Sequence, residues 1–192
     1  LHVGHGRLVM MDLDIDDSGA MSAVWAALPD DLRTKLDSAP MRYGKGHKAA
    51  LAVRLAVGEQ AHYRVASQGY DKGDGKVHRV EVFGKASHVF MGYGAHSVEA
   101  DKSVSVEYRW RDDVGPHNVP LGQLPEVTDK DILALCHAAT VAMKGLGWQC
   151  VTAGGVVTEP ATVFDLEPNM EFETRDFGAV DLAGLEEICQ SS

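Results

Sequence analysis

Three aspartates at alternate positions, Asp12, Asp14 and Asp16, follow directly after the apolar residues 8–11. A short apolar run is typical of a buried β-strand, and successive side chains of a strand point to opposite faces, so the three carboxylates are expected to share one face. Like charges on one face repel one another unless water or a cation neutralises them. Carboxylate oxygens suit hard cations such as Mg²⁺ and Mn²⁺, and two such ions can support phosphoryl or nucleotidyl transfer.

A simpler interpretation of the same residues is a strand that ends in an acidic surface turn. In that interpretation Asp17 is the N-cap of the next helix, because an aspartate there accepts a hydrogen bond from a free backbone amide. Apolar residues at positions 21, 24, 25 and 28 recur at helical spacing and indicate that helix. The Asp-x-Asp pattern alone favours this interpretation, so the case for a metal site depends on the rest of the chain.

A turn rich in glycine and basic residues, residues 44–48, follows about thirty residues later. It separates a short strand that ends near Tyr43 from a second strand that is expected to start at His47. Glycines allow backbone amides to approach a phosphate closely, and Lys45 with His47 would add positive charge. The spacing is not that of a Walker A loop. A plain hairpin with a surface histidine is the alternative.

A further carboxylate, Glu81, belongs to an alternating segment, residues 77–83. Val80 and Val82 are expected to point to one face of this strand, and Glu81 to the other. Glu81 is therefore an acid in a strand that otherwise has a buried pattern.

The remaining elements follow from the same patterns. Strands are expected over residues 62–67, 89–93 and 104–110, and a flexible polar loop over residues 69–76. Thr128 with Asp131 is similar to a capping box at the start of a helix. We expect one domain over residues 1–150, and a loosely structured cover or linker over residues 151–192.

The net charge of −10 is unevenly distributed. Residues 33–111 carry fourteen basic and eight acidic side chains, a net of +6, whereas residues 1–32 carry −5 and residues 112–192 carry −11. A basic middle can bind a polyanion while the whole chain stays acidic. A well-solvated mixed surface explains the same charges equally well.

The composition, 45% apolar and 24% charged, is typical of a globular protein. No apolar run approaches the length of a membrane span, so no membrane partner is expected. The three cysteines are far apart and form no Cys-x-x-Cys pair. This argues against a zinc site and a disulfide framework, and it is consistent with a reducing cytoplasm.

The order of these features resembles the bifunctional primase-polymerase (prim-pol) family of archaeo-eukaryotic primases, which occurs in plasmids, phages and mobile elements. The resemblance covers about residues 7–110: the acidic strand, the Gly-Lys-Gly-His turn, the strand with Glu81 and the strand that ends at Trp110. It implies an α+β fold, in which an RNA-recognition-motif-like sheet module packs with a smaller α/β unit.

The resemblance also implies roles for individual residues. The acids that hold two Mg²⁺ or Mn²⁺ ions and carry catalysis would be Asp12, Asp14 and Glu81. The nucleotide-binding residues would be Lys45, Gly46, His47, Lys48 and His88. The basic residues that follow the phosphates of template and primer would be Arg42, Arg54, Arg64, Arg79 and Lys85.

The chain departs from the family pattern at several positions. Asp16 offers a second register, in which the acidic pair is Asp14 and Asp16. Lys45 stands two residues before His47, where the family usually has serine or glycine. Glu81 stands where aspartate is common, and no zinc-binding cysteine cluster is present.

The activity that the resemblance implies is that of a template-dependent DNA polymerase and primase that transfers nucleotides from dNTPs or NTPs to a 3′-hydroxyl. Its partners would be single-stranded DNA template, primer, and a downstream helicase domain or partner. A two-metal nuclease would use the same acids without a triphosphate grip. A replication-initiator or nucleic-acid-binding module without catalysis is the third hypothesis.

Overall fold

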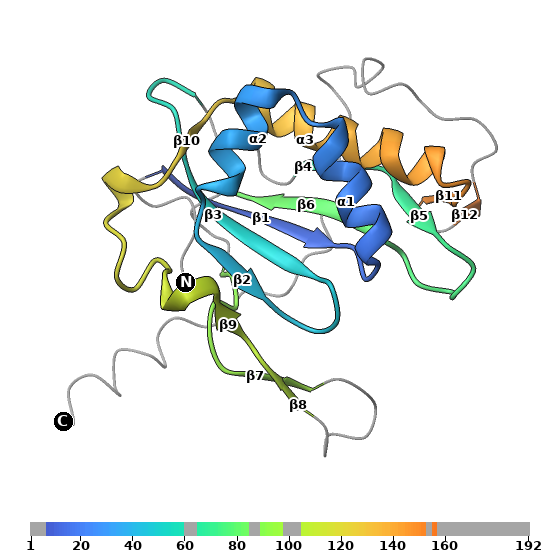
Figure 1. The fold of residues 1–192 in the computed structure, drawn as a ribbon, viewed down its shortest axis with the longest axis horizontal. Helices are drawn as coiled ribbons and strands as arrows, with labels where there is room; N and C mark the ends of the chain where they lie inside the picture. The colour runs from blue at the N-terminus through green and yellow to red at the C-terminus, as the bar shows by residue number, and fades with distance from the viewer. Residues whose placement is uncertain (1–6, 60–64, 85–88, 98–104, 153–154, 157–192) are drawn as a thin grey trace, which may run out of the picture. The chain divides into compact units, whose positions relative to one another are not determined.

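The computed structural model describes residues 7–59, 65–84, 89–97, 105–152 and 155–156 (Figure 1). These residues belong to one compact unit, Leu1–Pro160. They form a mixed α+β structure with an antiparallel main sheet and three α-helices, as the α+β class predicts. No helix among the described residues combines the length and the apolar character that crossing a membrane requires.

The main sheet has β1 near its centre. Its path of hydrogen-bonded strands runs β4-β6-β1-β3-β2-β9, with neighbours antiparallel, and β10 adds to β3 in parallel. The strands are β1 (Leu8–Asp14), β2 (Met41–Tyr43), β3 (Ala49–Leu55), β4 (Val65–Ala66), β6 (Arg79–Phe83), β9 (Arg109–Trp110) and β10 (Glu126–Val127).

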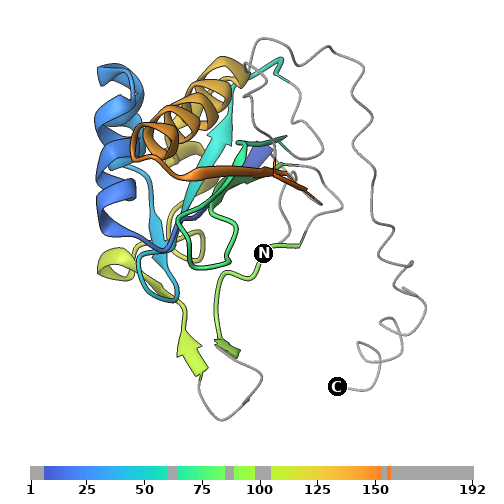
Figure 2. The same ribbon diagram turned by 90° about the vertical axis from the view of Figure 1, so that its right-hand side faces the viewer.

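The helices pack on one face of this sheet (Figures 1 and 2). They are α1 (Ser18–Ala27), α2 (Asp30–Asp37) and α3 (Asp129–Gly145). Asp17 caps α1 by accepting a hydrogen bond from the Ala20 amide at 2.9 Å, as the sequence predicted. Thr128 and Asp131 form the predicted capping box of α3.

Alternation along β1 separates its two faces. Val9, Met11 and Leu13 belong to the core under the helices, where each is at most 1% exposed. Met10 belongs to a smaller apolar cluster on the opposite face, and Asp12 shares that face by alternation.

Two smaller sheets complete the described structure. The strand β5 (Gly69–Asp71) pairs with β11 (Gln149–Thr152), which pairs with β12 (Gly155–Val156). The strands β7 (Ala95–Ser97) and β8 (Ser105–Glu107) form an antiparallel pair. The boundary expected at residue 150 therefore falls inside β11.

Residues 89–93 do not form the predicted strand. Two of their carbonyl groups bond to side chains instead of a strand ladder: Arg42 donates to the Met91 carbonyl, and Trp110 Nε1 donates to the Gly92 carbonyl at 3.0 Å. Burial still alternates as the sequence pattern suggested, since Phe90 is buried in the smaller cluster and Met91 is 56% exposed, but the segment is not a strand of the sheet.

Other predicted boundaries shift. The strand β3 starts at Ala49 instead of His47, because the Gly44 amide bonds to the Lys48 carbonyl at 3.1 Å and closes the turn between β2 and β3. The strand predicted over residues 104–110 is divided into β8 and β9. Of residues 62–67, the described part contains the two-residue strand β4.

Candidate active site

Strand pairing brings together two acids that lie far apart in the sequence. Asp12 of β1 and Glu81 of β6 are direct partners in the antiparallel register, and Asp14 is paired with Arg79 two residues further on. Side chains that are directly opposite in such a pair have Cβ atoms roughly 5 Å apart. Asp12, Asp14 and Glu81 therefore lie on one face of the sheet, as predicted.

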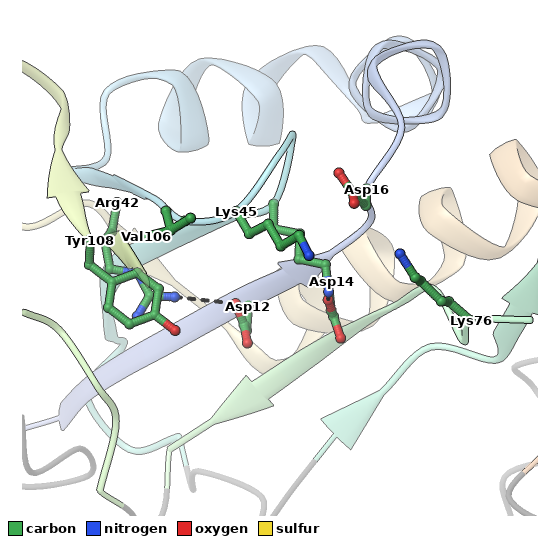
Figure 3. A pocket seen from close by; sticks show the side chains of 10 residues that line it. Asp12, Asp14, Asp16, Arg42, Lys45, Lys76, Val106 and Tyr108 are labelled. Atoms are coloured by element: carbon green, nitrogen blue, oxygen red, sulfur yellow. Dashed lines mark ion pairs between the residues drawn. The ribbon is translucent and has the colours of Figure 1, made fainter. Parts of the chain in front are cut away.

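A cavity of about 370 Å³ opens on this face (Figure 3). Both signs of charge line it, from the end of β1, from β2 and the turn after it, from the loop between β5 and β6, and from the β8–β9 segment. The lining residues are Asp12, Asp14, Asp16, Arg42, Gly44, Lys45, Lys48, Lys76, Val106 and Tyr108.

Asp12 is the most perturbed acid of the site. Its pKa is raised to about 6, mainly by burial and also by the nearby charges of Asp14 and Glu81, while Arg42 and Lys48 act in the opposite direction. Burial disfavours the charged form because the carboxylate loses water, so Asp12 exchanges its proton close to neutral pH. A cation bound beside it would favour the charged form.

Arg42 forms a wall of the cavity. Its guanidinium lies 3.8 Å from the Asp12 carboxylate, with its central carbon 3.9 Å from the centre of the Tyr108 ring and 4.5 Å from that of Phe90. Burial lowers the pKa of Arg42, although Asp12 and Tyr108 oppose this shift. The residue is 6% exposed, so it contacts the site acid instead of lying on an open DNA-binding surface.

Lys48 forms an ion pair with Asp14. Partial burial acts to lower the pKa of Lys48, but the hydrogen bond and charge of Asp14, together with Asp16 and Asp12, outweigh burial and raise it. Lys48 is therefore held as a cation next to the acidic pair. Lys45 lines the same cavity from the turn before it.

The acids of the site match the needs of a hard cation in their chemistry. Asp12, Asp14 and Glu81 offer oxygen ligands only, which suits Mg²⁺ or Mn²⁺. In this conformation each is paired with a base, since Glu81 forms an ion pair with Arg79. Among the described residues no three acids, histidines or cysteines are grouped as a metal site. These side chains are of the type that binds a divalent ion. For the ion to bind, the Lys48 and Arg79 side chains would have to move away from Asp14 and Glu81.

Asp16 lies beyond the end of β1 and bonds to the glycine-rich turn. Its Oδ1 accepts a hydrogen bond from the His47 amide at 3.1 Å. Gly46 has φ +62°, and a Cβ atom there would lie 1.9 Å from Asp16 Oδ1. Of the two possible registers of the acidic pair, Asp12 and Asp14 share the strand, whereas Asp16 anchors the turn.

Other predicted residues lie elsewhere. The His47 side chain is exposed and does not line the cavity. Arg54 bonds to the Leu124 carbonyl at 2.9 Å and lies 2.8 Å from the Glu126 carboxylate, next to β10. Predicted residues that fall outside the described part of the chain are Arg64, Lys85 and His88.

Lys76, Val106 and Tyr108 line the cavity, but the sequence did not indicate them as site residues. The sequence pattern places Tyr108 in a strand and Lys76 in a solvated loop. For Tyr108 no local signal exists, because its place depends on the pairing of β9 with β2. For Lys76 the Asp71-x-Gly-Asp-Gly pattern could have indicated an ordered turn.

Comparison of the chain with protein-family models, with curated proteins and with solved structures found no match. The likeness to primase-polymerases therefore depends on the chain's own residues and their order, and the function is argued from the site.

Proposed function

We propose that this chain is a template-dependent nucleotidyltransferase, a DNA polymerase that can also prime. The observation that supports the proposal best is the direct cross-strand pairing of Asp12 with Glu81, with Asp14 on the same face, beside a cavity with basic walls. Acids that hold metals and bases that hold phosphates are the two requirements of nucleotidyl transfer.

The site residues would divide these tasks. Mg²⁺ or Mn²⁺, held by Asp12, Asp14 and Glu81, would supply Lewis-acid stabilisation of the attacking and leaving oxygens. Arg42 lies against Asp12 and favours its charged form, which is the form that binds a cation. Lys45 faces the cavity from the turn and can neutralise an incoming polyphosphate.

A primase-type core is also a proposal. The order β1-α1-α2-β2-β3 agrees with the first half of a β-α-β-β-α-β module except for the additional helix α2. The long helix α3 follows β6, whereas in that module the second helix precedes the last strand. We further propose DNA template and primer as partners, a helicase domain or partner downstream, and a cytoplasmic setting in the host of a plasmid, phage or mobile element.

The test is primer extension on single-stranded DNA with labelled dNTPs and Mg²⁺ or Mn²⁺. Wild type is compared with Asp12→Asn and with the control Asp31→Asn, an exposed aspartate on α2. We expect metal-dependent extension in wild type and control and its loss in Asp12→Asn. Omitting the primer then tests priming. Metal-dependent cleavage without extension would indicate the nuclease instead.

A non-catalytic nucleic-acid-binding module is the second candidate. The observation that favours it is the pairing of each site acid with a base, which neutralises the acids without metal. A thermal-shift titration with Mn²⁺ separates the two. A rise in the unfolding temperature that Asp12→Asn removes favours the enzyme, and DNA binding with no response to metal favours the module.

A further inference from the structure

The loop between β5 and β6 is organised by its own carboxylates. Asp71 Oδ1 accepts hydrogen bonds from three successive amides, those of Gly73 at 2.7 Å, Asp74 at 3.0 Å and Gly75 at 3.1 Å. Asp74 Oδ1 then accepts the Lys76 amide at 3.0 Å. Of the polar loop predicted over residues 69–76, residues 69–71 form β5 instead, and these hydrogen bonds shape the rest into an arm, residues 72–78.

This arm is attached to the end of β1. Lys72 Nζ donates to the Asp16 carbonyl at 2.9 Å, and the Asp16 amide donates to His78 Nδ1 at 3.2 Å. His78 is 1% exposed, and its other ring nitrogen lies 3.3 Å from Asp74 Oδ1. Both groups of the Asp16 backbone thus bond to the arm, which fixes the arm beside the acidic strand.

The arm presents Lys76 to the cavity. Lys76 and Lys45 line it from two different loops, with Asp14 between them in the view of Figure 3. Arg42 and Lys48 already face acids, whereas within the described part of the chain the Lys76 amine has neither an ion pair nor a hydrogen bond. Lys76 is therefore a cation that lines the cavity and, among the described residues, forms no ion pair with an acid.

The turn at His47 is less suited to an anion. Its amide already donates to the Asp16 carboxylate, so in this conformation the amide is not available to a phosphate oxygen. The His47 side chain lies outside the cavity lining, whereas Lys76, which is likewise exposed, belongs to it. Of the groups that made this turn a phosphate-binding hypothesis, the His47 amide is bonded to Asp16, and Lys45 still lines the cavity.

We propose that Lys76, together with Lys45, binds the polyphosphate of the incoming nucleoside triphosphate, and that Lys76 carries the role that the resemblance assigns to His47. The nucleotide identity of the ligand rests on the proposed function. The polyanion site itself rests on the cavity and the arm alone.

Binding of inorganic tripolyphosphate to the 192-residue chain, measured by titration calorimetry without metal, tests the proposal. Lys76→Ala should weaken binding about tenfold, the effect of losing one charge-assisted contact. Lys76→Arg should retain most of the affinity. His47→Ala and the control Lys144→Ala, an exposed lysine at the end of α3, should remain within about twofold of wild type.

Three results would overturn the inference: no tripolyphosphate binding by wild type, equal affinity of Lys76→Ala and Lys144→Ala, or a larger loss in His47→Ala than in Lys76→Ala. Primer extension separates this outcome from failure of the proposed function. If extension depends on Asp12 but the dNTP KM is unchanged in Lys76→Ala, the Lys76 site is wrong and the transferase stands. If Lys76→Ala weakens tripolyphosphate binding but neither wild type nor any variant extends a primer, the anion site is supported and the transferase proposal is wrong.

Discussion

The two faces of the central sheet use the same strands under different constraints. On the face under the helices, Leu13 and Val80 are fully buried among apolar neighbours. On the opposite, open face the adjacent residues of the same strands, Asp12 and Glu81, are acids paired with bases, and Asp12 lines the cavity while Glu81 is not among its lining residues. The face under the helices carries the larger apolar core. The other face carries a smaller apolar cluster and also places the like charges of Asp12 and Glu81 side by side, which opposes folding.

Substitutions at neighbouring residues of one strand should therefore have opposite effects on the stability of the fold and on the chemistry of the site. Substitutions on the helix face should reduce the free energy of unfolding and leave the chemistry of each folded molecule intact. Substitutions on the open face should remove the chemistry and leave the fold as stable as before, or more stable.

The largest effect is expected from Glu81→Gln. Primer extension should fall about a thousandfold, equal to about 4 kcal/mol of transition-state stabilisation, because a neutral amide cannot replace a metal-binding carboxylate. Urea denaturation should show a change in the free energy of unfolding below about 1 kcal/mol, since Arg79 is partly exposed and keeps its water. Val80→Ala, on the other face, should give the reverse pattern. Parallel loss of folding and activity in Glu81→Gln would mean that this acid is structural.

Leu13→Ala should lower the free energy of unfolding by about 2–5 kcal/mol, because it leaves a cavity under the helices at a fully buried position. The partner experiment is Asp14→Ala, one residue away on the open face, which should cost less than about 1 kcal/mol. Urea titration of both variants measures the contrast. Similar losses at the two positions would remove the distinction between the faces.

The stability of the folded chain should depend on pH through Asp12. The pKa of Asp12 in the folded chain is about 6, above the ordinary value of 3.8, so the folded state holds its proton more tightly than the unfolded state. The contribution of Asp12 to stability therefore falls as pH rises from about 4 to about 6, by up to about 3 kcal/mol. Asp12→Asn should be more stable than wild type at pH 7 and lose that advantage near pH 4. Chemical denaturation at both pH values is the check, and a constant difference would contradict the pKa.

The smallest effect is expected at Gly46. An alanine there would combine a left-handed backbone with a Cβ atom 1.9 Å from Asp16 Oδ1. Gly58 has φ +86° and nothing within 4 Å of the point where a Cβ atom would lie, so Gly58→Ala has the backbone strain without the clash. Gly46→Ala should cost about 1 kcal/mol more than Gly58→Ala, by thermal denaturation. Equal costs would show that Asp16 moves aside freely.

The local sequence pattern was sufficient to predict much of the fold and the shared face of the site acids. Alternation alone placed Asp12 with Asp14, and Glu81 opposite Val80, because the period of a strand is set by its backbone. The N-cap at Asp17 and the capping box at Thr128 were likewise predictable, since caps depend on residues a few positions apart.

The rest depended on contacts between distant segments. Nothing near Arg42 in the sequence indicates that Tyr108 and Phe90 stack on it, because that requires β9 and the segment after β6 to fold over it. The strand predicted at residues 89–93 failed for the same reason, since side chains of Arg42 and Trp110 bond to its carbonyls.

The pairing of Asp12 with Glu81 has a consequence for the order of folding. Local hairpin contacts can form β2 with β3 early, but β1 and β6 meet only after a long loop has closed, which makes their pairing a slow, non-local step. A ligand that bridges the two acids can bind only after that step, so it stabilises the completed sheet selectively. Amide hydrogen exchange in β6 should therefore report occupancy of the site, slowing when a ligand holds β1 and β6 together.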